Sequence, residues 1–168
     1  KLDFDIPHLH EVFENIISSD EFNIYEDPIL PNEKLSVTIT SFSYKREIPI
    51  DLADNGGGYV FDCRGLNNPG RLLDFKLLNG RNTEVINFLK TNSKLDYYMS
   101  HIYPLVDSTI ETYLKRGFKN LMINFGCTGG QHRSVYCADE MFKYLKNKYD
   151  INVFLSHIEQ GIKEEVIK

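Results

Sequence analysis

The chain has 168 residues, of which 42% are hydrophobic and 26% charged, a composition that suits a single globular domain with some length left over at its ends. Its 19 Lys and Arg against 24 Asp and Glu give a net charge of −5, which repels nucleic acid overall. No apolar run reaches the length of a membrane span, the N-terminus lacks a signal-peptide block, and three irregularly spaced cysteines suggest no disulfide framework, so we expect a cytoplasmic protein with reduced thiols.

Residues 1–34 are predicted to form an N-terminal helix and a connector, separate from a main domain at 35–168. Apolar residues recur with helical spacing over residues 9–17, and two prolines within residues 21–34 disfavour regular structure there. The chain begins with Lys1 rather than Met, which suggests a piece of a longer protein.

The first half of the main domain shows two strand patterns and two helix patterns. Alternation of apolar and polar residues predicts a half-buried strand at 34–42, and a glycine-rich turn precedes a short strand at 59–63. Helical spacing follows at 82–90 and at 95–116, where Pro104 predicts a kink or a restart and Gly117 closes the segment.

The second half opens with a continuous apolar run at 120–126, which is typical of a strand buried on both faces of a parallel sheet. A helix is predicted at 131–149, and residues 152–156 are expected to form the last strand. This order predicts an α/β fold with a mainly parallel sheet flanked by helices. Ligands of such sheets lie beyond the carboxyl ends of the strands, which is where "FGCTGGQHRS" at 125–134 falls.

This decapeptide has the composition of a phosphate-binding loop at a strand-to-helix junction. Free amides and the helix dipole make the start of a helix partly positive, and Gly129 and Gly130 allow close backbone approach to an anion. Arg133 offers a planar fork that matches phosphate oxygens, and Thr128 and Ser134 add hydroxyl groups. A Gly-Gly turn with a capping serine would explain the glycines but leaves the arginine beside the positive helix end unexplained.

His132 has three readings: a contact to the ligand, a general acid, or a buried hydrogen-bonded ring. Asp62 and Arg64 end the strand at 59–63, where they either pair with each other or face the same pocket. No histidine has metal-ligand spacing, so we predict neither a metal nor a cofactor.

Cys127 and Arg133 also fit the spacing Cys-x-x-Gly-x-x-Arg-Ser, which is similar to the signature loop of cysteine-dependent phosphatases. A helix N-terminus and a cation would activate the thiol as a nucleophile. The histidine that usually precedes the cysteine is Gly126 here, and a leaving-group acid would have to come from Asp54, Asp62 or Asp74. Alternatively, Cys127 is a small residue that closes a buried strand.

Three ordered motifs resemble the C-terminal domain of the RapZ proteins, bacterial RNase adapters. They are "SFSYKREIPI", "YVFDCRGLNNPG" and "GCTGGQHRSVY", and the resemblance covers about residues 36–155. It implies a domain that binds glucosamine-6-phosphate and a small regulatory RNA and that self-associates. A separate upstream domain of the family carries a nucleotide-binding Walker loop, and this chain contains no such loop.

The resemblance also implies which residues contact the ligand. Four departures stand out: Gln131 replaces a usual lysine, Gly70 a usual histidine, and Ser43 and Glu47 usual glycines. The family's basic tail is replaced by an end in which glutamates offset the lysines, so we do not expect RNA to bind. The predicted phosphate contacts are Thr128, Gly129, Gly130, Gln131, His132, Arg133 and Ser134, with Asp62, Arg64, Ser41 and Lys45 lining the pocket.

The sequence therefore predicts a sugar-phosphate-sensing module, without enzymatic activity, that reports occupancy to an upstream domain or partner and forms a homo-oligomer. A phosphatase that uses Cys127 and Arg133, and a small-RNA-binding adapter, are the alternatives.

Overall fold

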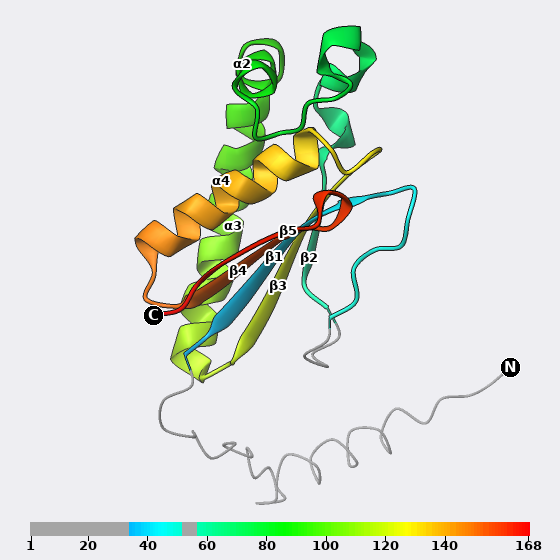
Figure 1. The fold of residues 1–168 in the computed structure, drawn as a ribbon. Coiled ribbons are helices and arrows are strands. Elements are labelled where there is room, and N and C mark those ends of the chain that lie inside the picture. The colour runs from blue at the N-terminus through cyan, green and yellow to red at the C-terminus, as the bar shows by residue number, and fades with distance from the viewer. Residues whose placement is uncertain (1–33, 52–56) are drawn as a thin grey trace, which may run out of the picture. The chain divides into compact units, whose positions relative to one another are not determined.

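The computed structural model describes residues 34–51 and 57–168 (Figure 1). The helix and most of the connector predicted for residues 1–34 lie outside the described residues, as does Asp54.

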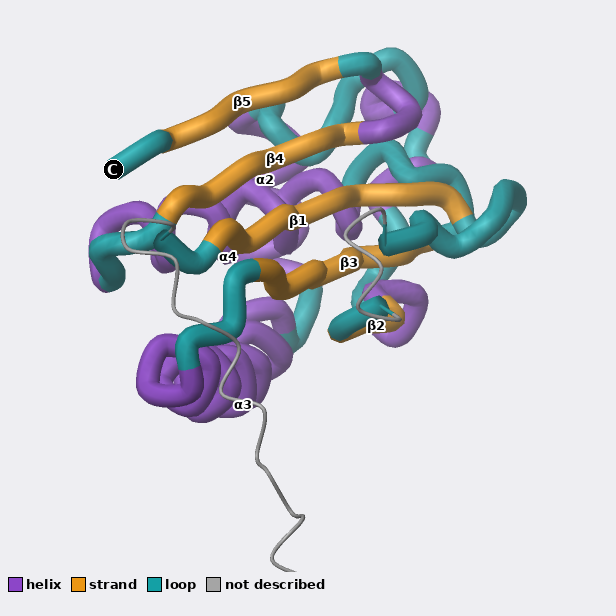
Figure 2. Tube along the Cα trace, turned by 90° about the horizontal axis from the view of Figure 1, so that it is seen from below, coloured by secondary structure: helices purple, strands orange, loops and turns teal. Residues whose placement is uncertain are grey.

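The described residues form a five-stranded α/β sheet, as predicted. Its strands are β1 (Ser36–Ser43), β2 (Tyr59–Asp62), β3 (Asn120–Cys127), β4 (Asn152–His157) and β5 (Ile162–Val166), in the spatial order β2-β3-β1-β4-β5. The central β1 runs parallel to β3 and β4, and β2 runs parallel to β3 (Figure 2). The carboxyl ends of these four strands therefore meet at one edge of the sheet.

The expectation that the strand at 152–156 is the last one is wrong. The chain turns through a short 3-10 helix, η4 (Ile158–Gln160), and Gly161 in the left-handed conformation, and β5 then returns antiparallel to β4. Alternation is present in β5, where Ile162 and Val166 are half-buried and Lys163 and Glu165 are exposed. Because this edge strand is rich in charged residues, a search of the sequence for apolar strands does not find it.

The described helices are α2 (Thr83–Asn92), α3 (Leu95–Arg116) and α4 (Arg133–Lys148). Helix α3 continues through Pro104 without a restart and ends at Gly117, whose φ of 74° is left-handed, as its position after the last turn predicted. Helix α4 starts at Arg133, two residues later than expected, because Gln131 and His132 still belong to the preceding loop. None of the helices in the described part of the chain has the length and hydrophobicity that crossing a membrane requires.

The core lies between the sheet and α4, which packs across β1, β3 and β4 (Figure 1). The apolar stripe predicted on α4 is buried, and β3 is buried along all but its first residue. Burying this stripe stabilises the helix by roughly 1.5–3 kcal/mol per large side chain. The stripe consists of Val135, Ala138, Met141, Phe142 and Leu145.

A carboxylate ties α3 to the end of α4. Asp107 on α3 accepts hydrogen bonds from the Tyr144 hydroxyl at 2.6 Å, the Lys148 ammonium at 2.7 Å and the Tyr149 hydroxyl at 2.7 Å. Burial by itself would raise the pKa of Asp107, but these three hydrogen bonds outweigh it, and the pKa lies below the ordinary value. This junction is a stabilising contact remote from the carboxyl edge of the sheet.

Candidate functional site

Three carbonyl groups of the loop between β3 and α4 accept hydrogen bonds from neighbouring segments. The Thr128 carbonyl accepts from the Ser43 hydroxyl at 2.8 Å, the Gly130 carbonyl from the Gln160 side chain at 3.1 Å, and the Gln131 carbonyl from the Gly80 amide at 2.9 Å. No acceptor among the described residues takes a hydrogen bond from the amides of Thr128, Gly129 or Gly130. These three amide donors are therefore available, whereas the three carbonyls are satisfied.

The two loop glycines serve different purposes. Gly130 has a φ of +60°, and a Cβ there would lie 2.5 Å from Glu159 Cγ and 2.9 Å from the Ser43 amide nitrogen, so only glycine fits. Gly129 does not have a positive φ, and a Cβ there would meet no protein atom within 4 Å. The fold therefore requires glycine at position 130, whereas at position 129 the absence of a side chain leaves the loop surface uncovered.

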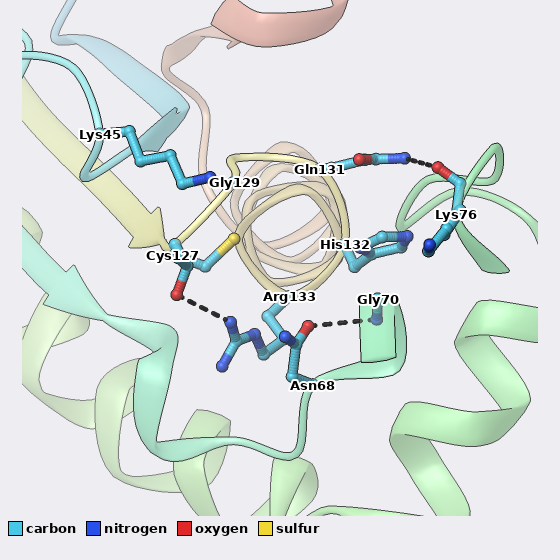
Figure 3. Close-up of a pocket in the computed structure, with 10 residues that line it drawn as sticks. Lys45, Asn68, Gly70, Lys76, Cys127, Gly129, Gln131, His132 and Arg133 are labelled. Atoms are coloured by element: carbon cyan, nitrogen blue, oxygen red, sulfur yellow. Dashed lines mark hydrogen bonds between the residues drawn. The ribbon is translucent and has the colours of Figure 1, made fainter. Parts of the chain in front are cut away.

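A cavity of about 200 Å³ lies against this loop (Figure 3). Three of its lining residues, Lys45, Lys76 and Arg133, are cationic, and no carboxylate is among the described residues that line it. In Figure 3 the Lys45 side chain extends toward the loop at Gly129. The complete lining is Lys45, Asn68, Gly70, Lys76, Cys127, Thr128, Gly129, Gln131, His132 and Arg133.

Arg133 is only 4% exposed, and its guanidinium donates hydrogen bonds to the loop and to the segment after β2. Nη1 donates to the carbonyls of Arg64 at 3.1 Å and Leu66 at 3.0 Å, and Nη2 donates to the Thr128 hydroxyl at 3.3 Å. Nε is buried without a partner among the described residues. The direct hydrogen-bond acceptors of this guanidinium are all neutral, although its charge also helps to lower the pKa of Asp62, so the buried positive charge favours an anion nearby.

His132 and Gln131 hold a second loop against the cavity. His132 Nε2 donates to the Phe75 carbonyl at 2.9 Å, and the Gln131 side-chain amide donates to the carbonyls of Lys76 at 2.8 Å and Leu78 at 2.6 Å. With Nε2 as donor, a neutral His132 has an unprotonated Nδ1 on the side facing Gly70. Gln131, predicted as a ligand contact, thus uses its side chain to position Lys76.

Cys127 and Ser134 lie together at the base of the site. The Cys127 sulfur is 3.1 Å from the Ser134 hydroxyl, and Ser134 is fully buried. Cys127 lines the cavity whereas Ser134, predicted as a phosphate contact, lies behind it.

Four other predicted site residues do not line the cavity, namely Gly130, Asp62, Arg64 and Ser41. Asp62 and Arg64 form an exposed ion pair at 2.7 Å, and the Arg64 guanidinium also covers the Tyr44 ring at 4.0 Å from its centre. The Arg64 side chain holds the pKa of Asp62 below its ordinary value. Ser41 is fully buried, and its hydroxyl forms a hydrogen bond with His157 Nδ1 at 2.8 Å. Of the two readings for Asp62 and Arg64, the structure favours mutual pairing.

Asn68 and Lys76 line the cavity but were missed in the sequence. Both belong to the segment that carries the 3-10 helices η2 (Pro69–Arg71) and η3 (Leu73–Phe75), and the Asn68 side chain caps η2 by accepting from the Gly70 amide at 3.1 Å. Asn before Pro is a recognisable turn signal, but it carries no information on where the turn docks. Among the described residues, no cluster of histidine, cysteine and carboxylate groups is suited to holding a metal ion.

The fold and the cavity define an α/β domain whose strand-to-helix loop faces a cation-lined cavity at the carboxyl edge of the sheet. The chain belongs to the RapZ C-terminal domain family, whose model matches residues 35–161.

Two similar relatives are about twice as long as the part of them that this chain matches. It is 36% identical to a nucleotide-binding protein of Dictyoglomus turgidum over 160 residues, which is 95% of this chain and 50% of the relative. It is also 36% identical to a nucleotide-binding protein of Staphylococcus aureus strain JH9 over 144 residues, 83% of this chain and 45% of that relative. The chain thus spans about half the length of the curated relatives it matches.

Proposed function

We propose that this domain binds a phosphate monoester of a sugar, of the glucosamine-6-phosphate type, in the cavity beside the loop at 128–132 and reports its occupancy to the rest of a longer regulatory protein. The observation that carries the proposal is the combination of unpaired loop amides, three cationic side chains and no lining carboxylate among the described residues. A dianionic phosphate complements such a surface through charge and amide hydrogen bonds.

The charges divide the cavity into a base and a rim. Arg133 is buried at the base, where its charge is poorly screened, whereas Lys45 and Lys76 are exposed. A phosphate on the amides at the base leaves the sugar toward the polar rim that Asn68 and Lys76 provide. This arrangement supports a phosphorylated small molecule over inorganic phosphate alone.

A cysteine-dependent phosphatase is the competing use of the same loop, and two observations favour binding over turnover. A Cβ at Gly126 would lie 2.5 Å from both Phe42 Cζ and Tyr44 Cε2, so a histidine does not fit before Cys127. Of the aspartates considered as leaving-group acids, Asp62 is paired with Arg64, and neither it nor Asp74 lines the cavity. None of the described aspartates therefore lies where it could protonate a leaving group in the cavity.

Isothermal titration calorimetry on the reduced chain tests the proposal. Glucosamine-6-phosphate, glucose-6-phosphate, inorganic phosphate and ATP are titrated separately in a phosphate-free buffer. We expect heat with the hexose phosphates, weaker heat with inorganic phosphate, and affinities that fall with added salt because the rim cations are screened. An absence of heat with every ligand would contradict the proposal, and heat with ATP alone would point to a nucleotide.

Lys45→Met is the sharper variant, because Arg133→Ala would also release the carbonyls of Arg64 and Leu66. Losing one charge-assisted contact to phosphate should weaken hexose-phosphate binding about tenfold, or about 1.4 kcal/mol. Lys90→Met, an exposed lysine on α2 that does not line the cavity, is the matched control and should leave the affinity unchanged. Equal affinities for both variants would place the ligand elsewhere. Release of phosphate from glucosamine-6-phosphate, measured in parallel, would favour the phosphatase alternative.

A further inference from the structure

The cavity contains a thiol whose surroundings differ from those of the other two cysteines. Cys127 lines the cavity at the end of β3, next to the start of α4. All three cysteines are buried in the hydrophobic core, with Cys127 2% exposed, but neither Cys63 nor Cys137 lines the cavity. The chain therefore carries its own internal controls for the reactivity of Cys127.

Hydrogen-bond donors converge on the Cys127 sulfur. The Ser134 hydroxyl lies 3.1 Å away, and the main-chain amides of Ser134 and Gln131 also donate to it. Burial by itself would raise the pKa of the Cys127 thiol, but these hydrogen bonds and the charge of Arg133 lower it below the ordinary value. Burial raises the pKa of Cys137 well above its ordinary value. The thiolate form is therefore more accessible at Cys127 than at Cys137.

Cationic side chains from three segments line the cavity together with Cys127. Arg133 comes from α4, Lys45 from the segment after β1, and Lys76 from the segment after η3. Arg133 is 4% exposed, and its Nε has no partner among the described residues. A thiolate at the loop is a natural counter-charge for this buried cation when no other anion is bound.

We propose that Cys127 is an oxidation site at which a peroxide converts the thiolate to a sulfenic acid, and that this modification and occupancy of the cavity by a phosphate ligand exclude each other. The second half rests on the proposed function, whereas the first half does not. The thiolate sulfur attacks one peroxide oxygen, so that the S–O bond forms as the O–O bond breaks. Hydroxide leaves and takes up a proton to become water; the sulfur is oxidised by two electrons and the peroxide is reduced.

Mutual exclusion follows from the position of the sulfur. An oxygen added to Cys127 would occupy part of the cavity and compete with the phosphate for the charge of Arg133. A ligand bound in the cavity that Cys127 lines would also block the approach of peroxide to the sulfur and so protect the thiol. A bound sugar phosphate would then keep Cys127 reduced, and oxidation of Cys127 by peroxide would prevent the sugar phosphate from binding.

Mass spectrometry with dimedone, which traps sulfenic acids, tests the first half on the full chain. After a short exposure to hydrogen peroxide at neutral pH, we expect the adduct on Cys127, formed at least about tenfold faster than on Cys63 or Cys137. Labelling of Cys127 that is no faster than that of the two core cysteines would overturn the assignment. A total rate of adduct formation that is undiminished in Cys127→Ser would do the same, since the adducts would then come from other thiols.

The pH dependence of iodoacetamide alkylation separates a tuned thiol from one that is merely accessible. Ser134→Ala removes the hydroxyl donor, and its Cys127 alkylation midpoint should move up by about one pH unit relative to the parent chain, checked for folding by circular dichroism. An unchanged midpoint in a folded variant would show that the Ser134 hydroxyl does not stabilise the thiolate.

Protection by ligand tests the second half. Glucosamine-6-phosphate at saturation should slow Cys127 oxidation at least about tenfold, and peroxide treatment should abolish the heat of binding measured by calorimetry. Binding to the reduced chain without any protection refutes mutual exclusion while leaving the proposed function intact. If dimedone labels Cys127 but no phosphate ligand binds the reduced chain, the proposed function and mutual exclusion both fail, and the oxidation site stands.

Discussion

Substituting the two adjacent loop glycines one at a time should produce opposite phenotypes. Alanine at Gly130 must adopt a φ near +60°, which costs about 1–2 kcal/mol for a residue with a Cβ. Its Cβ would also lie 2.5 Å from Glu159 Cγ and 2.9 Å from the Ser43 amide nitrogen, and overpacking of this kind typically costs about 1–3 kcal/mol. The restricted unfolded chain returns up to about 1 kcal/mol. We therefore expect Gly130→Ala to lose about 2–4 kcal/mol of unfolding free energy.

Gly129→Ala is the matched control for stability, because its Cβ meets no protein atom within 4 Å and its φ is not positive. We expect its unfolding free energy to stay within about 1 kcal/mol of the parent value, with any change toward stabilisation. Urea denaturation followed by circular dichroism at one fixed pH measures both variants. Equal losses at the two positions, or a larger loss at Gly129, would refute the assignment of structural strain to Gly130.

Three further outcomes are expected. Gly129→Ala should retain the fold but weaken hexose-phosphate binding at least about tenfold in calorimetry. The reason is that the added methyl group stands on the loop surface that lines the cavity. An undiminished affinity would place the ligand away from the loop. Asp107→Asn should lower the unfolding free energy by about 1.5–3 kcal/mol at neutral pH. The pKa of Asp107 is lowered on folding, so the stabilisation it provides is present above the unfolded-state pKa and is lost as the pH falls through the folded-state pKa. The difference in unfolding free energy between variant and parent, measured by urea denaturation, should therefore shrink below about pH 4. A difference that stays constant with pH would contradict this account. A small RNA should give no gel shift even at low salt, where electrostatic binding is strongest, and a steeply salt-dependent shift would overturn that expectation.

The elements that the sequence predicted well are those whose signal is local and repetitive. The apolar stripe of α4 and the continuous apolar run of β3 each describe a buried face directly, and the structure buries both. The start of α4 was placed two residues early because Gln131 and His132 have no helix-breaking character of their own. They stay outside the helix while their side chains bond carbonyls of a segment more than fifty residues away in sequence.

Among the predicted site residues, the loop itself was the most accessible to sequence reasoning. The glycine pair and Arg133 share one short run, so their proximity follows from chain connectivity. The roles of Asp62 and Ser41 could not be read in the same way, because strand position does not say whether a side chain meets a pocket or a neighbour. Asp62 lies within reach of the Arg64 guanidinium, and Ser41 faces His157 inside the sheet.

The sequence by itself determined the α/β order of the elements, the place of the strand-to-helix loop at the carboxyl edge, and the need for glycine in that loop, because each depends on residues close together in the chain. Tertiary structure alone decided that Lys76 and Asn68 complete the cavity, that Gly130 and not Gly129 carries the strained conformation, and that the amides of Gln131 and Ser134 meet the Cys127 sulfur. These features depend on hydrogen bonds and close contacts between distant segments, and such contacts leave no periodic trace in the sequence.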